Sequence, residues 1–433
     1  MTMLELVKHL NFAVVVLFTL LYLYQGFYVV VGLVRRRWQD RHQPSRLHRF
    51  AVIVSARNEE GVIGELLESL NRQNYPKELL DLYVVADNCT DDTAGVARRA
   101  GAFVYERFDQ VHKGKGYAMD YLFRRLKEEG KDCYDGYFVF DADNLVDANF
   151  VAEMNRTFDQ GYDAVTCYRN SKNFAANWIS AGYSIWFLRE ARFLNFPRTL
   201  LGTNCHVSGT GFLVSARVIE DNGGWPFHLL TEDIEFSVYH ILQGRTIGFC
   251  ADAVLYDEQP ATFRQSWRQR LRWARGFLQV FRKYGFGLVK GMGKGSFSCY
   301  DMSMTVMPAF LLTVALIVSY LVVGLSALGG GVGSEITFFQ GLYYILQMLA
   351  GLYGVLFVVG LFTTITEWEN IHTTPAKKVL YTITFPIFML TYIPISLVAL
   401  FSRKVQWKPI QHHRADRRVL EAAAAGTKRI QNQ

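Results

Sequence analysis

The stretch Gly136-Tyr137-Phe138-Val139-Phe140-Asp141-Ala142-Asp143 places two carboxylates directly after an apolar run. A short apolar run bounded by polar residues is typical of a buried β-strand, so we expect both aspartates at its carboxyl end. Carboxylates at positions i and i+2 can share a divalent ion, which neutralises a leaving group if it also holds a diphosphate. A solvated turn is the alternative, because aspartate-rich turns often follow strands.

The segments around this stretch alternate between two patterns. Strand-like runs cover 50–54, 82–86, 103–105 and 136–140, and helix-like segments cover 60–73, 91–100 and 115–129. Strands separated by helices predict a mainly parallel α/β sheet, with functional residues after the carboxyl ends of its strands.

Acidic and basic residues follow these strands. Glu59 and Asp87 come after the first two, and Lys113-Gly114-Lys115-Gly116 opens a helix. Backbone amides at a helix start, together with Lys115, suit a phosphate. With the aspartate pair, these residues predict a nucleotide-diphosphate pocket.

Three later segments carry polar groups. Residues 173–200 predict an aromatic and basic helix, located either at an interface or in the core. Ser208-Gly209-Thr210-Gly211 is a glycine-rich segment, and Thr231-Glu232-Asp233-Ile234-Glu235 precedes a helical pattern. In that last segment Thr231 or Asp233 could simply cap a helix over 234–242.

The stretch Gln269-Arg270-Leu271-Arg272-Trp273 joins a mixed region to a strongly apolar one. In a helix, Gln269, Arg272 and Trp273 share one face. A guanidinium suits a phosphate and an indole suits a sugar ring. The alternative is an amphipathic helix on a membrane surface whose basic face is formed by arginines 264, 268, 270, 272 and 275.

The 433 residues are 50% hydrophobic and include 32 Phe and 23 Tyr, which is more apolar than an ordinary soluble protein. Apolar stretches at 11–34, 305–328, 339–364 and 379–401 predict an integral membrane protein. The net charge is +7, but no nucleic-acid-binding signature is present, so the basic residues indicate membrane lipids as partners and not nucleic acid. Six scattered cysteines indicate neither zinc nor a disulfide framework.

The chain carries four short motifs in sequence: Asp87, the DAD at 141–143, the TED at 231–233 and the QRLRW at 269–273. Because of these motifs and their order, residues 50–280 resemble the membrane-bound family 2 glycosyltransferases, which include cellulose, hyaluronan and poly-N-acetylglucosamine synthases. The resemblance implies a GT-A-like α/β fold and a hexosyltransferase that inverts the anomeric centre. The expected donor is a nucleotide sugar, UDP-linked, and the expected cofactor is Mg²⁺ or Mn²⁺.

The resemblance also implies roles for single residues. Glu59 and Asp87 would hold the nucleobase and ribose, and Lys115 would lie near the base or a phosphate. Asp141 would support the nucleotide sugar, and Asp143 would bind the metal ion. The remaining assignments are Asp233 as general base beside Glu232, Gln269 and Arg272 on the donor diphosphate, and Trp273, Ser208 and Gly209 on the acceptor.

Two departures from the family pattern stand out. Ala86-Asp87-Asn88-Cys89 replaces paired aspartates before Gly-Ser, and Ile234-Glu235 replaces the arginine-bearing form of hyaluronan synthases. The second departure argues against hyaluronan as product. A growing polysaccharide is the expected acceptor. A lipid acceptor and an inactive transport or assembly subunit remain the alternatives, and a homo-oligomer could supply further spans around a channel.

The distribution of Lys and Arg predicts a multi-pass protein of the cell membrane with its catalytic domain in the cytoplasm. Pro386 and Pro394 interrupt the last apolar stretch and predict a re-entrant hairpin. The expected organisation is a transmembrane helix over 1–34, a catalytic domain over 35–260, amphipathic interface helices over 261–300, a transmembrane region with two spans and the hairpin over 301–402, and a basic cytoplasmic tail over 403–433.

Overall fold

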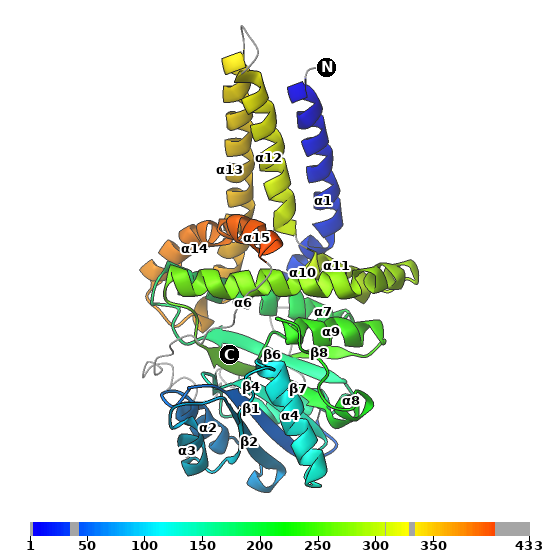
Figure 1. Ribbon diagram of the computed structural model, residues 1–433, viewed down its shortest axis with the longest axis vertical. Helices are drawn as coiled ribbons and strands as arrows, with labels where there is room; N and C mark the ends of the chain where they lie inside the picture. The colour runs from blue at the N-terminus through cyan, green and yellow to red at the C-terminus, as the bar shows by residue number, and fades with distance from the viewer. Residues whose placement is uncertain (1–2, 35–42, 308, 329–333, 403–433) are drawn as a thin grey trace.

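The computed structural model describes residues 3–34, 43–307, 309–328 and 334–402. Figure 1 shows an α/β body at one end of the molecule and three long helices at the other. A layer of helices lies across the molecule between them. The predicted tail over 403–433 lies outside the described residues, and its position stays a prediction.

The body contains one eight-stranded sheet with strand order β3-β2-β1-β4-β7-β6-β8-β5. Its strands are β1 (Phe50–Ala56), β2 (Leu80–Asp87), β3 (Phe103–Arg107), β4 (Gly136–Asp141), β5 (Leu145–Val146), β6 (Ala164–Ser171), β7 (Phe212–Ser215) and β8 (Ile247–Asp257). The first four strands are parallel, whereas β7 runs antiparallel to both of its neighbours. The predicted mainly parallel sheet is therefore confirmed.

Both faces of the sheet are buried at β1 and β4, which explains why these two strands are almost continuously apolar. Ile53 and Val139 belong to one hydrophobic core, whereas Val52 and Phe138 belong to the core on the other face. The helices and short helical turns of the body are α2 (Ile63–Asn71), η1 (Lys77–Leu79), α3 (Thr93–Arg99), α4 (Lys115–Glu128), α5 (Phe150–Phe158), α8 (Ala216–Asp221) and α9 (Glu232–Leu242).

Between the body and the long helices lies a layer that the chain builds from distant segments (Figure 1). It comprises α6 (Trp178–Glu190), the π-helical turn η2 (Ala191–Asn195), α7 (Phe196–Leu200), α10 (Phe263–Gly293), α11 (Phe297–Val306), η3 (Trp368–Asn370), α14 (Pro375–Leu390) and α15 (Tyr392–Phe401). The helix predicted over 173–200 is observed from residue 178 to residue 200 with the π turn inside it.

Arg270 corrects one of the sequence interpretations. Its side chain is fully buried, and Nη1 donates to the Phe388 carbonyl oxygen at 3.0 Å and to Thr391 Oγ1 at 2.6 Å. The guanidinium also lies over the rings of Phe388 and Tyr392. The alternative in which Arg270 forms part of an exposed basic face is wrong, because α14 and α15 cover that side of α10.

The long helices are α1 (Met3–Val34), α12 (Ala309–Leu328) and α13 (Ser334–Thr366). Within the described residues, three segments are long and apolar enough to cross a membrane, namely Glu5–Val34, Phe338–Thr366 and Pro375–Phe401. A fourth exists if Phe297–Val306 and Phe310–Leu325, which meet at 52°, form one span.

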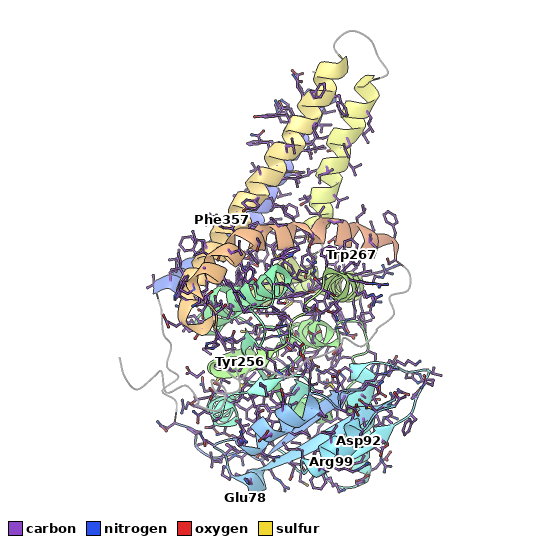
Figure 2. All side chains as sticks on the ribbon, turned by 90° about the vertical axis from the view of Figure 1, so that its left-hand side faces the viewer. Glu78, Asp92, Arg99, Tyr256, Trp267 and Phe357 are labelled. Carbon is purple, nitrogen blue, oxygen red and sulfur yellow. The ribbon has the colours of Figure 1, made fainter. Side chains whose placement is uncertain are left out.

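The apolar segments differ in how much of their surface is exposed. Large apolar side chains such as Phe12 and Leu20 are more than 60% exposed on α1, as expected for a surface that contacts lipid. In contrast, 44% of the most apolar part of Pro375–Phe401 is buried within the protein, and Figure 1 shows α14 and α15 across the base of the long helices. Figure 2 shows the charged residues Asp92 and Arg99 at the opposite end of the molecule. The apolar end indicates a membrane protein.

Candidate active site

A cavity of about 620 Å³ lies between the carboxyl ends of β1, β2 and β4 and the helices above them. The parallel register sets Ser55 beside Asp141 and Ala56 beside Ala86, so residues that follow these strands meet at one edge. All twelve residues predicted for the site line this cavity: Glu59, Asp87, Lys115, Asp141, Asp143, Ser208, Gly209, Glu232, Asp233, Gln269, Arg272 and Trp273.

Asp87 is buried at the end of β2 and pairs with Arg107, whose Nη1 donates to Oδ1 at 2.6 Å. Burial raises the pKa of Asp87, and the Arg107 guanidinium opposes that rise. The next residue, Asn88, has a φ of +54°, which asparagine tolerates better than most residues, and its amide donates to Asp87 Oδ1 at 2.9 Å. Asn88 therefore helps to hold the single aspartate in this variant of the family motif.

Lys115 is the first residue of α4 and connects two walls of the cavity. Its Nζ donates to Asp141 Oδ1 at 2.5 Å and to the Gly209 carbonyl oxygen at 2.7 Å. The adjacent Gly116 is required sterically, because a Cβ there would lie 2.2 Å from the Phe227 carbonyl oxygen. The glycine thus lets the segment before the TED pack against the start of α4.

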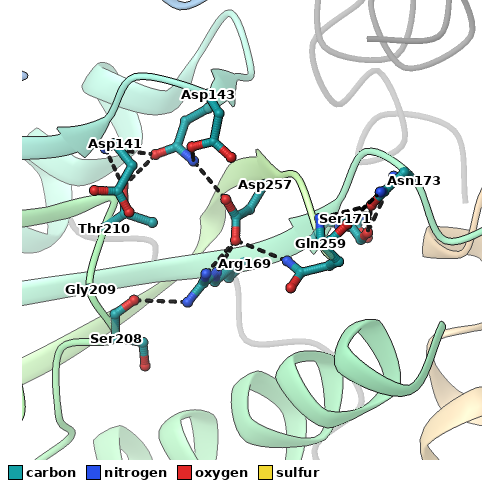
Figure 3. A network of polar contacts seen from close by, with 12 residues as sticks. Asp141, Asp143, Arg169, Ser171, Asn173, Ser208, Gly209, Thr210, Asp257 and Gln259 are labelled. Atoms are coloured by element: carbon teal, nitrogen blue, oxygen red, sulfur yellow. Dashed lines mark hydrogen bonds and ion pairs between the residues drawn. The ribbon is translucent and has the colours of Figure 1, made fainter. Parts of the chain in front are cut away.

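A polar network supports the aspartate pair from below (Figure 3). Asn144 Nδ2 donates to Asp257 Oδ1 at 3.0 Å, and Arg169 Nε donates to Asp257 Oδ2 at 2.9 Å. Arg169 Nη1 also donates to the Ser208 carbonyl oxygen at 2.9 Å. Sequence reasoning missed Arg169 and Asp257. Asp257 is another acid at a strand end, the pattern that identified Asp87, whereas Arg169 lies inside β6 and carries no local signal.

The donor atoms near this network fit a magnesium or manganese ion. Across the described ranges, no group of three or more His, Cys, Asp or Glu side chains could form a protein-only cage. Mg²⁺ usually keeps waters and binds one or two carboxylates together with substrate phosphates, and Asp141 and Asp143 offer such carboxylates at the cavity wall. The Lys115 ammonium donates to Asp141 Oδ1 at 2.5 Å, whereas the neutral Asn144 amide donates to Asp143 Oδ1 at 3.5 Å, so a cation already balances the charge of Asp141.

Glu232 and Asp233 begin α9, so Asp233 lies inside the helix and does not cap a helix starting at 234. Thr231 occupies the N-cap position, but its side chain makes no capping hydrogen bond. Burial raises the pKa of both carboxyl groups, and the charge of Asp233 raises that of Glu232 further. Lys115 and Arg272 oppose these shifts. A raised carboxyl pKa is a common property of catalytic acids and bases.

Glu235, which belongs to the second departure from the family pattern, holds neighbouring segments together. Its buried carboxylate accepts from the backbone amides of His228 and Leu229 at 3.1 and 3.0 Å. It also accepts from Lys283 Nζ at 2.6 Å and from Tyr284 Oη at 3.2 Å. Glu235 therefore ties the segment before α9 to α10, the helix that carries QRLRW.

Gln269, Arg272 and Trp273 lie on the face of α10 that lines the cavity. The Trp273 ring contacts Tyr183 edge-on, with 5.6 Å between ring centroids, and Phe187 at 6.2 Å. Gln269 Oε1 is buried without a hydrogen-bond partner in the described part of the chain. Buried polar atoms are usually bonded, so this oxygen is available to a ligand.

The cavity continues from the TED towards the base of the long helices, which the sequence prediction did not include. Glu190 lies in this part, where its Oε1 is 3.4 Å from His206 Nε2 and accepts from Ser208 Oγ. Burial acts to raise the pKa of Glu190, but His206 and Ser208 outweigh it and lower that pKa to about 2. The aromatic and basic content of 173–200 was the signal that could have identified this wall.

Residues 48–276 match the profile described as "Glycosyltransferase like family 2". The chain is 25% identical over 291 residues to the probable glycosyltransferase YdaM of Bacillus subtilis, covering 63% of this chain and 65% of that protein. It is 26% identical over 299 residues to a beta-monoglucosyldiacylglycerol synthase of Nostoc sp., covering 66% of this chain and 61% of that protein. It is 25% identical over 249 residues to a poly-beta-1,6-N-acetyl-D-glucosamine synthase of Staphylococcus aureus, covering 56% of this chain and 58% of that protein.

These matches span less than two thirds of the length of each relative. Among solved structures, a mannosyltransferase from Pyrobaculum calidifontis in complex with GDP-Man and Mn²⁺ aligns with a TM-score of 0.53 at 16% identity, covering 89% of this chain and 99% of that one. That likeness concerns the fold. Because the family profile covers more than half of the 433 residues, this chain belongs to the family 2 glycosyltransferases, enzymes that transfer a sugar from a nucleotide-linked donor.

Proposed function

We propose that this chain is an inverting, metal-dependent glycosyltransferase of the cell membrane, with its catalytic domain in the cytoplasm and a UDP-sugar as donor. The observation that carries the proposal is the single cavity that joins the acidic strand ends, the DAD, the TED and the QRLRW. Such a transfer needs groups that bind the donor and a base for the acceptor. The acidic residues at the strand ends would serve the donor, and Asp233, a carboxyl group whose pKa is raised, would serve as the base.

The donor half would bind the nucleotide. Glu59 and Asp87 would hold the base and ribose, and Gln269 and Arg272 would contact the diphosphate, where a guanidinium offers paired N–H donors. Mg²⁺ or Mn²⁺ on Asp143, when bound, would neutralise the charge that develops on the leaving diphosphate.

Asp233 would act as general base. Its carboxylate would take the proton of the acceptor hydroxyl while that oxygen forms a bond to the anomeric carbon. The bond from this carbon to the diphosphate breaks on the opposite face, and its electron pair leaves with the nucleotide. Attack from the opposite face inverts the anomeric centre. A positioned base of this kind contributes a factor of about 10²–10⁴.

We propose a lipid as acceptor, because the far end of the cavity is apolar. Its lining there includes Met304, Met307, Phe310 and Leu311, at the base of the long helices. The name of the Nostoc relative, a beta-monoglucosyldiacylglycerol synthase, agrees with a lipid product. A growing polysaccharide is the second candidate. The family members that carry QRLRW favour it, as does the name of the Staphylococcus relative.

Purified protein in lipid vesicles, supplied with a panel of nucleotide sugars and Mg²⁺ or Mn²⁺, tests this proposal. One added sugar on a lipid supports the lipid acceptor, whereas a ladder of long products supports polysaccharide extension. D233N should bind nucleotide and remain folded but lose transfer, and D221N, which changes an exposed carboxylate outside the cavity lining, should transfer normally. Unchanged turnover in D233N would reject Asp233 as base. Nucleotide release from no donor would reject the enzymatic function.

A further inference from the structure

Arg189 is an arginine of the cavity wall to which the proposed reaction assigns no role. It lies on α6 in the cavity wall, half-buried, where its Nη2 donates to Gln25 Oε1 at 2.8 Å and its guanidinium lies 4.7 Å from the Trp186 ring centroid. Buried Arg198 pairs with Asp301 at 2.7 Å, and Arg169 pairs with Asp257. In contrast, no carboxylate of the described residues lies within ion-pair distance of Arg189.

The neighbouring acid does not neutralise this charge through a direct contact. The Glu190 carboxylate is engaged by His206 and Ser208. Burial lowers the pKa of Arg189 to about 10, so the guanidinium still carries its charge at neutral pH. The Glu190 charge acts on the guanidinium only through space, so an anionic ligand in direct contact would stabilise this half-buried cation further. Phosphate is the anion whose geometry a guanidinium matches best.

The wall around Arg189 has a second property, because it is apolar on the side of the long helices. Contributions come from four elements that the fold brings together at this level: Met304 of α11, Phe310 and Leu311 of α12, Met389 of α14 and Tyr392 of α15. A hydrocarbon chain fits the apolar part of this wall, which also contains the polar side chains of Gln25, Thr305 and Ser396. The cavity therefore offers the Arg189 guanidinium beside a largely apolar surface.

We propose that Arg189 forms the headgroup subsite for a lipid that carries a phosphate, with its hydrocarbon chain against the wall between α11, α12 and α15. The inference rests on the proposed function for the reaction itself and adds the chemical class of the acceptor. The hydroxyl that receives the sugar belongs to the head of the same lipid and reaches Asp233 along the cavity. Either a glycerophospholipid or a polyisoprenyl phosphate bearing a sugar supplies this chemistry.

Lipid binding to the full-length protein in a neutral detergent tests the proposal, with native mass spectrometry as readout. The probes are phosphatidylglycerol, a polyisoprenyl phosphate bearing a sugar, and uncharged diacylglycerol. The wild-type protein should retain at least one of the two phosphate lipids and lose diacylglycerol. R189Q should weaken phosphate-lipid binding by about tenfold, R189K should retain part of it, and R282Q, which changes an exposed arginine of α10, should bind like the wild type. The phosphate lipid that binds more tightly identifies the source.

Calorimetric titration of UDP with Mn²⁺ separates this inference from the proposed function. If no variant and no wild-type protein binds the nucleotide, the proposed function fails. If nucleotide binding is normal but R189Q and R282Q bind phosphate lipids equally, the headgroup subsite is rejected. Loss of nucleotide affinity in R189Q would instead assign Arg189 to the donor site, and this outcome would also reject the headgroup subsite. The comparison of the two phosphate lipids with diacylglycerol needs only the wild-type protein, so the proposal is overturned, even if R189Q does not fold, when neither phosphate lipid binds more tightly than diacylglycerol.

Discussion

The Nζ atom of Lys115 lies 2.5 Å from Oδ1 of Asp141 and also donates to the Gly209 carbonyl oxygen, so one ammonium group links the acidic pair to the loop that faces Asp233. The same positive charge opposes the burial that raises the pKa of Asp233. Lys115 therefore influences both the donor half and the base of the proposed reaction.

K115Q should shift the pH dependence of transfer in a defined direction. A general base acts only when deprotonated, so activity is present above its pKa in the enzyme and is lost as the pH falls through it. Removing the Lys115 charge raises the pKa of Asp233 further, and the acidic limb of kcat/KM should move to higher pH. K127Q, an exposed substitution on the same helix, should leave the limb in place. A shift to lower pH in K115Q would contradict the proposed coupling.

The two aspartates of the DAD should respond differently to substitution. Because the Lys115 ammonium competes with a metal ion for Asp141, whereas Asp143 accepts from the neutral Asn144 amide, D143N should cost more metal affinity than D141N. We expect D143N to lower kcat on the order of 100-fold, since metal charge stabilisation contributes several kcal/mol. Electron paramagnetic resonance of Mn²⁺ titrated in the presence of UDP measures the affinity without turnover. Equal losses in D141N and D143N would contradict the division of roles, and full activity with a chelator would contradict metal dependence.

Local pattern predicted the acidic edge of the sheet because each acid directly follows an apolar strand. The parallel register then sets the ends of β1, β2 and β4 side by side. The same pattern also marks Asp257, but its pairing with Arg169 could not be predicted, since 88 residues separate the two and only the pairing of β6 with β8 brings them together. Arg189 and Gln25 are 164 residues apart and meet only because α1 packs against the helix layer. The helical spacing of QRLRW predicted the cavity face of α10 but not the packing that buries Arg270 on its other side.

W273A should separate acceptor binding from donor binding. The indole contacts Tyr183 and Phe187 edge-on, so its position is fixed before any ligand arrives. We expect the KM for the acceptor to rise about tenfold, which corresponds to the loss of one aromatic contact, while UDP affinity changes little. W273F keeps a ring at the site and should recover part of the loss. Equal losses of acceptor and nucleotide affinity in W273A would show that Trp273 does not serve the acceptor alone.

Arg270 allows a stability prediction in which two substitutions should act in opposite ways. Nη1 bonds to Phe388 and Thr391, whereas Nε and Nη2 are buried without hydrogen-bond partners in the described structure and lie among aromatic rings. R270A removes the contacts and leaves a cavity, so the free energy of unfolding should fall by about 2–4 kcal/mol. R270M fills the same volume without burying a charge and should be close to the wild type or more stable.

Thermal unfolding in detergent compares these two variants with R264A, a substitution of an exposed arginine at the start of α10 that should change stability by less than about 0.5 kcal/mol. The order expected for the unfolding temperature is R270A lowest, with R264A and R270M near the wild type. If R270M is as unstable as R270A, the hydrogen bonds to Phe388 and Thr391 outweigh the cost of the buried charge. If R270A is as stable as the wild type, Arg270 does not hold α10 against α14 and α15, and the position of the QRLRW helix depends on other contacts.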